Sequence, residues 1–192
     1  MADPDLVAQL ARQIADVESR PAGSAAPERT TPLPEGGAKA LGQLVRSVTQ
    51  RPLTVAEARD KLRAREHDEE VIDAVIDHAI AGKLLDDRAF ATVWVTDRGV
   101  NRGYGRERLQ RELRRRKVEQ SVIDEALGLL EESDEVGQAT ELARQRAQRM
   151  PATLEPHKVA QRLVGFLVRR GFASHVAHDV ARRVTAMDRQ WD

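Results

Sequence analysis

The sequence is 192 residues long, with 41% hydrophobic, 3% aromatic and 32% charged residues, and its 31 basic and 31 acidic residues leave no net charge. The absence of cysteine excludes disulfides and thiolate zinc sites, and no stretch of about eighteen apolar residues is present to span a membrane. The start of the chain, with Asp3 and Asp5, does not resemble a secretory signal. We therefore expect a soluble cytoplasmic protein, and the abundance of Ala, Leu, Arg and Glu favours an all-α fold.

Residues 1–38 differ in composition from the rest of the chain. They hold five of the eight prolines and three glycines. Leu6, Leu10, Ile14 and Val17 recur at helical spacing and predict one short helix. The stretch 20–37 has too little apolar surface to offset its ordering entropy, so it is predicted to be disordered. The sequence therefore predicts a flexible amino-terminal arm over residues 1–38.

From residue 38 onward the apolar pattern is helical. A stripe over residues 41–48 predicts a first helix, which Pro52 ends. Thr54, followed three residues later by Glu57, has the pattern of a capping box and opens a second helix. A third helix carries a stripe over residues 71–79, and Gly82 is expected to form the turn at its carboxyl end.

The same order of helices then recurs twice. A fourth helix, capped by Asp86 or Asp87, carries Phe90 and Trp94 on one apolar stripe and is broken at 103–105. The remaining predicted helices are a basic one from Arg106 to Lys117, one striped over 122–130, one from 133 or 134 to about Met150, and two striped over 159–167 and 176–184.

An internal repeat underlies this order. A shift of 51 residues places Leu62 on Leu113 and Val71 on Val122, and a further 54 places Leu113 on Leu167. Each unit of three short helices is small for an independent core, so neighbouring units should stack. We predict an all-α protein of three tandem three-helix repeats, at 39–86, 87–132 and 133–192, forming an elongated array.

Several short motifs in this region resemble the RecX family of regulatory proteins. They are Leu85-Asp86-Asp87-Arg88-Ala89-Phe90-Ala91, then Arg98, Gly103-Tyr104-Gly105, Leu109 and Glu112-Leu113, and finally Arg169-Arg170-Gly171-Phe172. The resemblance covers about residues 39–188. Arg65-Glu66-His67 departs from it, because a glycine followed by an apolar residue is more usual there.

The resemblance implies a function as well as a fold. It implies binding to the RecA filament on DNA, and inhibition of the ATPase, strand-exchange and coprotease activities of RecA. Such a protein modulates homologous recombination, DNA repair and the SOS response. No cofactor, metal or catalytic residue is expected, and the chain is expected to be a monomer.

Basic residues gather where such a protein could meet an anionic partner. Residues 98–117 hold nine basic and two acidic residues, whereas 66–87 and 119–141 are strongly acidic. On the helix from Arg106, the residues Arg108, Arg111 and Arg115 share a face away from Leu109 and Leu113. Glu107 is expected to pair with Arg111 and Glu112 with Arg116, which leaves five residues without a local partner, namely Arg106, Arg108, Arg114, Arg115 and Lys117.

A second basic stripe follows the helix over 159–167. We predict that both surfaces bind RecA and single- or double-stranded DNA without sequence specificity, through Arg98, Arg102, Arg106, Arg108, Arg111, Arg114, Arg115, Lys117, Lys158, Arg162, Arg169 and Arg170. The alternative reading of the second stripe is scattered surface charge.

Other interpretations of the chain remain open. The basic helix could act as a helix-turn-helix reader of DNA, although Gln110 is its only amide side chain and base readout usually mixes Arg with Asn or Gln. A helical adaptor that binds through its acidic blocks is a third possibility. His175, His178 and Asp179 are expected to be ordinary surface groups, and Asp86-Asp87 a helix cap, so no enzyme activity is predicted.

Overall fold

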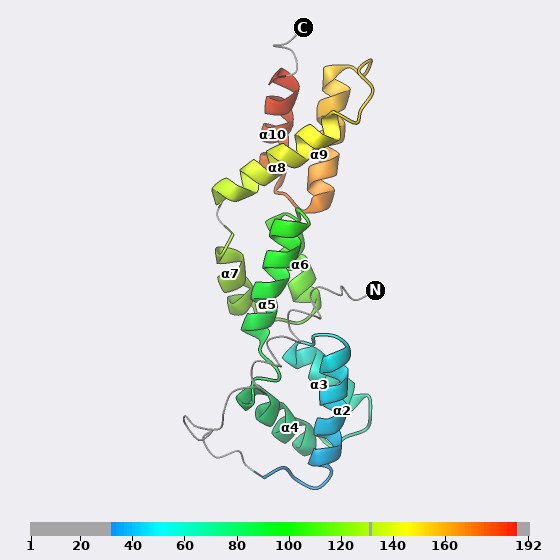
Figure 1. Cartoon of the computed structure of the whole chain (residues 1–192), viewed down its shortest axis with the longest axis vertical. Helices are drawn as coiled ribbons and strands as arrows, with labels where there is room; N and C mark the ends of the chain where they lie inside the picture. The colour runs from blue at the N-terminus through cyan, green and yellow to red at the C-terminus, as the bar shows by residue number, and fades with distance from the viewer. Residues whose placement is uncertain (1–31, 131, 188–192) are drawn as a thin grey trace. The chain divides into compact units, whose positions relative to one another are not determined.

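The computed structural model describes residues 32–130 and 132–187; the predicted helix at Leu6–Val17 and the rest of residues 1–31 lie outside this part. Every regular element in the described residues is a helix, as the composition predicts. The α-helices are α2 (Gly37–Gln50), α3 (Val55–Arg63), α4 (Glu69–Ala81), α5 (Asp87–Val95), α6 (Arg106–Arg115), α7 (Gln120–Gly128), α8 (Glu132–Ala147), α9 (Pro156–Arg170) and α10 (Ser174–Met187), and a π-helix, η1 (Thr96–Asn101), follows α5 (Figure 1).

The described residues form two compact units. The first contains the residues up to Val93 together with Arg116–Glu119, and the second contains Trp94–Arg115 and the residues from Gln120 onward. In the first unit α2, α3 and α4 pack together around side chains such as Leu44, Leu62 and Ile72, of which at most 1% is exposed.

The second unit has its own apolar core. Helices α8, α9 and α10 pack around fully buried side chains that include Leu163, Leu167 and Phe172. Helix α6 packs on α7, with Leu109 and Ile123 fully buried. The apolar stripes predicted from helical spacing therefore become the cores of both units.

Helix starts follow the predicted capping residues. The Thr54 hydroxyl accepts a hydrogen bond from the Glu57 amide at 3.2 Å, and the Glu57 carboxylate accepts one from the Thr54 amide at 3.3 Å, so the predicted capping box is confirmed. The Asp86 carboxylate accepts from the amides of Arg88 and Ala89, each at 3.0 Å, and thereby caps α5. These bonds satisfy amides that a helix start leaves without partners.

Two predicted helix ends are wrong, whereas a third is confirmed. Gly82 is the C-cap of α4, as predicted, at a φ of −78°, and the left-handed residue of that turn is Lys83, with a φ of 60°. The basic helix ends at Arg115, before Lys117, and α8 ends at Ala147, before Met150. The π-helix after Val95 was not predicted, because a change of hydrogen-bond register leaves no clear trace in the apolar pattern.

The turns before α4, α7 and α10 share an unusual backbone conformation. Glu66, Lys117 and Gly171 have φ values of 60°, 60° and 91°, and they are separated by 51 and 54 residues, the two offsets of the sequence repeat. The repeat therefore extends to the backbone of this turn. A left-handed backbone costs a residue with a β-carbon about 1–2 kcal/mol, and only the third turn has glycine there.

Replacing Glu66 by glycine is expected to stabilise the first unit. Glu66 is exposed, and glycine removes its left-handed strain while losing about 0.5–1 kcal/mol of chain entropy, so the net gain is about 0.5–1 kcal/mol. Urea unfolding followed by circular dichroism measures the gain. Glu66→Ala keeps the β-carbon and should give none, and an equal gain for Ala and Gly would contradict the strain argument.

Candidate functional site

Helix α6 buries its two leucines as the sequence predicts, but its exposed face includes Arg114 in place of the predicted Arg108. Leu109 and Leu113 are fully buried, whereas Arg111, Arg114 and Arg115 are exposed. We refer to these three arginines as the α6 basic face. Arg111 lies 3.6 Å from the Glu107 carboxylate, which confirms the predicted pair, and the Arg114 Nε donates to the Gln120 side chain at 2.8 Å.

Arg115 is the least engaged residue of the α6 basic face. Its side chain makes no hydrogen bond or ion pair with the residues that the structure describes. The Arg111–Glu107 pair and the Arg114–Gln120 bond lie at the surface, where such contacts contribute little and exchange readily with a new partner. This face therefore presents three guanidinium groups that a phosphate or carboxylate can reach.

The predicted pair between Glu112 and Arg116 is wrong. Glu112 is only 9% exposed, and its carboxylate accepts from Arg98 Nη1 at 3.3 Å and from Arg108 Nε at 2.9 Å. Arg98 also stacks over Trp94, and Arg108 over the ring of Tyr104, with 3.7 and 3.6 Å between guanidinium carbon and ring centre. Arg108 was expected to lack a local partner, yet both arginines hold η1 and α6 together instead of facing solvent.

Other predicted binding residues also serve the interior of the second unit. Arg106 Nη1 donates to the Leu127 carbonyl at 2.9 Å, and the Arg106 amide donates to the Glu135 carboxylate at 3.1 Å. Arg106, which was expected to lack a local partner, therefore has partners that are distant in the sequence. The Arg102 Nε lies 3.3 Å from the Asp97 carboxylate. These arginines fix the start of α6 and the end of η1.

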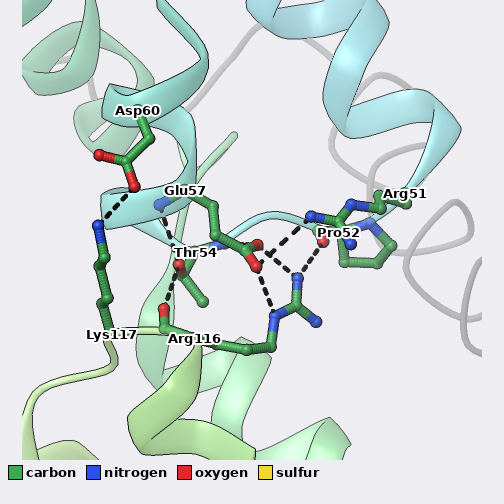
Figure 2. A network of polar contacts seen from close by, with 7 residues as sticks. All are labelled: Arg51, Pro52, Thr54, Glu57, Asp60, Arg116 and Lys117. Carbon is green, nitrogen blue, oxygen red and sulfur yellow. Dashed lines mark hydrogen bonds and ion pairs between the residues drawn. The ribbon is translucent and has the colours of Figure 1, made fainter. Parts of the chain in front are cut away.

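Arg116 belongs to a polar network in the first unit (Figure 2). Its Nε donates to Glu57 at 2.9 Å and its Nη2 donates to the Pro52 carbonyl at 2.9 Å. In the reverse direction, the Thr54 hydroxyl donates to the Arg116 carbonyl at 2.9 Å. The turn before α7 therefore holds the start of α3 by both its side chain and its backbone, an arrangement that we call the arginine clamp.

Two carboxylates next to this clamp have shifted pKa values. The Lys117 ammonium lies 2.6 Å from the Asp60 carboxylate and lowers the pKa of that carboxyl. Asp60 is a partner of Lys117 that the sequence did not predict. Burial raises the pKa of the Asp87 carboxyl, although it accepts a 2.8 Å hydrogen bond from the Val55 amide. Asp87 thus caps α3, and the expectation that Asp86-Asp87 serves helix capping is confirmed.

A second arginine clamp occurs in the second unit. Arg170 Nη1 donates to the carbonyls of Arg102 and Gly103 at 2.7 and 3.3 Å, and the Arg170 carbonyl accepts from the Gly105 amide at 3.0 Å. Arg116 and Arg170 are 54 residues apart, as are the two turns. This role of Arg170 was not predicted from the sequence, although the recurrence of arginine at the repeat offset is a signal that could have revealed it.

Glycine makes the second clamp possible. A β-carbon on Gly105 would lie 2.4 Å from the backbone of Gly171, and one on Gly171 would lie 2.2 Å from the β-carbon of Arg108. Such distances exclude any larger residue without a shift of the backbone. The start of α6 and the turn before α10 are therefore in direct backbone contact.

Helix α9 carries the second predicted basic stripe. Lys158, Arg162 and Arg169 are exposed, and we call them the α9 basic face. Lys158 lies 3.0 Å from the Glu155 carboxylate, a surface contact of small energy. Arg170 differs from its neighbour Arg169 because it is half-buried in the second clamp.

The described part of the chain has neither a cluster of metal ligands nor a helix that could span a membrane. Within residues 32–130 and 132–187 no group of three or more histidine or acidic side chains could hold a metal ion. Asp179, instead of joining His175 and His178 in a ligand set, accepts from Arg182 at 3.1 Å. Over the same ranges, no helix has the length and apolar character needed to cross a membrane.

The chain is a tandem three-helix repeat protein. Its helices pack in triplets, its left-handed turn recurs in each triplet, and the described residues contain no strand. Family models for the first, second and third three-helix domains of RecX match residues 40–78, 86–127 and 133–180. The chain therefore belongs to the RecX family of regulatory proteins.

Relatives agree with this assignment, and a solved structure agrees with the fold. Regulatory protein RecX of Mycobacterium ulcerans (strain Agy99) is 37% identical over 163 residues, which cover 85% of this chain and 93% of that protein. The RecX protein of Thermobifida fusca (strain YX) is 37% identical over 164 residues, 84% of each chain. The crystal structure of RecX from Lactobacillus salivarius, at 18% identity, superposes with a TM-score of 0.72 over 79% of this chain and 98% of that one. The fold of three tandem three-helix repeats is thus confirmed.

Removing the Glu112 carboxylate is expected to destabilise the second unit. Glu112→Ala leaves two half-buried arginines unpaired and should lower the free energy of unfolding by about 2 kcal/mol. Glu107→Ala on the same helix removes only an exposed pair and should cost less than about 0.5 kcal/mol. Urea unfolding of both variants gives the comparison, and equal losses would show that Glu112 is not a structural centre.

Alanine at Gly105 is expected to disrupt the second clamp. The added β-carbon meets the backbone of Gly171, so Gly105→Ala should cost about 1–3 kcal/mol. Gly137 lies inside α8 with open space around it, and Gly137→Ala should instead add about 0.5–1 kcal/mol. Thermal and urea unfolding measure both, and a Gly105→Ala protein as stable as wild type would refute the close contact.

Proposed function

We propose that this chain binds RecA filaments on DNA and lowers the ATPase, strand-exchange and coprotease activities of RecA. Membership of the RecX family supports the class of partner. The observation that carries the proposal is the α6 basic face, where Arg111, Arg114 and Arg115 point away from buried Leu109 and Leu113. A chain without net charge keeps these cations exposed while Arg108 and Arg116 are paired within the fold.

The α6 and α9 basic faces provide the binding energy in this mechanism. Each guanidinium that meets a DNA phosphate releases condensed counterions, which makes binding depend steeply on salt. Two faces on one chain make the second contact intramolecular once the first has formed, so weak contacts add. A chain bound at two places on a filament hinders the cycling of RecA subunits that ATP turnover requires.

The twelve basic residues predicted from sequence divide into two groups in this proposal. The residues of the α6 and α9 basic faces, with Lys117, contact DNA or acidic RecA surface. Arg98, Arg102, Arg106, Arg108 and Arg170 support the fold on which those faces are carried. In this proposal the chain acts as a cytoplasmic monomer, uses no cofactor and catalyses no reaction.

Charge reversal of the α6 basic face is expected to abolish the inhibition of RecA. Arg111→Glu, Arg114→Glu and Arg115→Glu together should remove three phosphate contacts and lower the salt slope of binding by about 2–3. The measurement is RecA ATPase on preformed single-stranded DNA filaments, where wild type should act at fewer than one copy per RecA subunit.

A charge-matched variant controls this experiment. Lys39→Glu, Arg46→Glu and Lys83→Glu reverse three exposed charges of the first unit and should inhibit like wild type. Full activity of the α6 variant, or no effect of wild type at several-fold excess, would contradict the proposal. Equal binding of wild type to random duplex DNA with and without RecA would instead favour a DNA-binding regulator.

A further inference from the structure

The first helix triplet, α2–α4, contains a third copy of the left-handed turn that carries the clamp arginine in the other two triplets, α5–α7 and α8–α10. Arg65 lies 51 residues before Arg116, and its neighbour Glu66 has the same φ of 60° as Lys117. The His67 amide donates to the Leu62 carbonyl at 3.4 Å, as the Phe172 amide donates to Leu167 at 3.1 Å in the third triplet. Arg65 is therefore held by the same backbone turn as the two arginines that clamp a helix start.

The Arg65 turn differs from the other two because it holds no helix start. Arg65 is exposed, and its Nη1 reaches only the Gln43 backbone and side-chain oxygens, at 3.3 and 3.4 Å. No backbone amide or hydroxyl of the described residues donates to the Arg65 carbonyl. The Arg65 carbonyl is thus free to accept from a partner, and the Arg65 guanidinium has only exposed contacts to Gln43, which exchange readily with a new acceptor.

We propose that the Arg65 turn binds the amino-terminal end of an α-helix in a partner protein, which is a RecA subunit if the proposed function holds. In the filled clamps the arginine carbonyl accepts from the residue that caps the helix, Thr54 or Gly105. The guanidinium donates to the carbonyl two residues earlier, at Pro52 or Gly103. A partner helix would be recognised through the same two backbone positions.

At the position given by the repeat offset, the third triplet of a second copy does not offer a matching helix start. The helix starts at Thr54 and Gly105 are already filled. In the third triplet, the residue 54 positions after Gly105 is Val159, which lies inside α9 with its amide bonded to the Glu155 carbonyl at 3.0 Å. Because α9 begins at Pro156, the carbonyl that the clamp would need at this offset lies inside the helix and not before its start.

A folded partner also suits the clamp better than a short peptide segment. An isolated helix shorter than about 12–15 residues is marginal in water, so its ordering entropy would oppose binding. A helix already held in a folded protein presents its free amides and the preceding carbonyl in fixed positions. The two filled clamps receive helices of that kind.

Substitution of Arg65 tests the proposal with three variants. On RecA filaments assembled on poly(dT), Arg65→Ala should weaken binding about tenfold, since a charge-assisted hydrogen bond is lost. Arg65→Lys should not restore affinity, because an ammonium cannot reproduce the planar fork of a guanidinium. Arg46→Ala removes an exposed arginine of α2 and should bind like wild type.

The salt dependence separates this contact from the basic faces. Carbonyl acceptors carry no counterions, so Arg65→Ala should leave the salt slope of binding unchanged, whereas reversal of the α6 basic face lowers it. Wild-type affinity of Arg65→Ala, or full rescue by Arg65→Lys, overturns the clamp while the proposed function stands. If the wild-type chain does not bind filaments, both the clamp proposal and the proposed function are overturned.

Cross-linking identifies the occupant directly. Because the chain has no cysteine, Glu70→Cys in the first turn of α4 can be labelled at a single site with benzophenone maleimide. Irradiation of the full chain on filaments should give a cross-link to a RecA peptide that includes the first turn of a helix. A cross-link to residues 1–31 of the same chain, or to a second copy, overturns the proposal.

Discussion

The contact between a left-handed turn and the start of a helix is the constraint on which both units depend. A triplet of short helices buries little apolar surface alone, and the first amides of each helix have no partner within it. The left-handed residues Lys117 and Gly171 follow Arg116 and Arg170, whose carbonyls accept from Thr54 and Gly105. One backbone conformation therefore satisfies helix-start groups in both units.

This constraint also determines which basic residues can reach a partner. Arg116 and Arg170 lie in the clamps, and Arg98 and Arg108 share the buried Glu112 carboxylate. A basic block counted from sequence therefore overstates the charge available at the surface. What remains exposed on α6 is confined to one face, so the electrostatic field of the block is directed instead of diffuse.

The apolar and capping features of the fold could be predicted from sequence because they depend on neighbours within one turn. Leu109 and Leu113 follow from helical spacing, and the Thr54–Glu57 box from its local pattern. The partner of Glu112 could not be predicted. Arg108 and Arg116 lie four residues before and after Glu112, so helical spacing allows either pair. Helix α6 ends at Arg115, which leaves Arg116 outside the helix and Arg108 as the partner of Glu112.

Tertiary contacts decided the remaining features that the sequence analysis missed. Arg116 pairs with Glu57, 59 residues away, and no spacing rule selects such a partner. At the end of α4, Gly82 forms the expected turn, but the left-handed residue of that turn, Lys83, was not predicted. A periodic pattern locates a turn, but its backbone depends on the atoms packed against it.

The two filled clamps achieve the same docking by different chemistry. The second depends on the close backbone approach of Gly105 and Gly171, which sterics specify and salt does not weaken. The first adds the Arg116–Glu57 and Lys117–Asp60 pairs, and the exposed Lys117–Asp60 pair is open to screening. The backbone geometry is common to both, whereas the side chains around it vary. Because both filled clamps combine this backbone geometry with an arginine side chain, the turn that gives cohesion inside the chain can, as we propose, serve recognition at an unfilled copy.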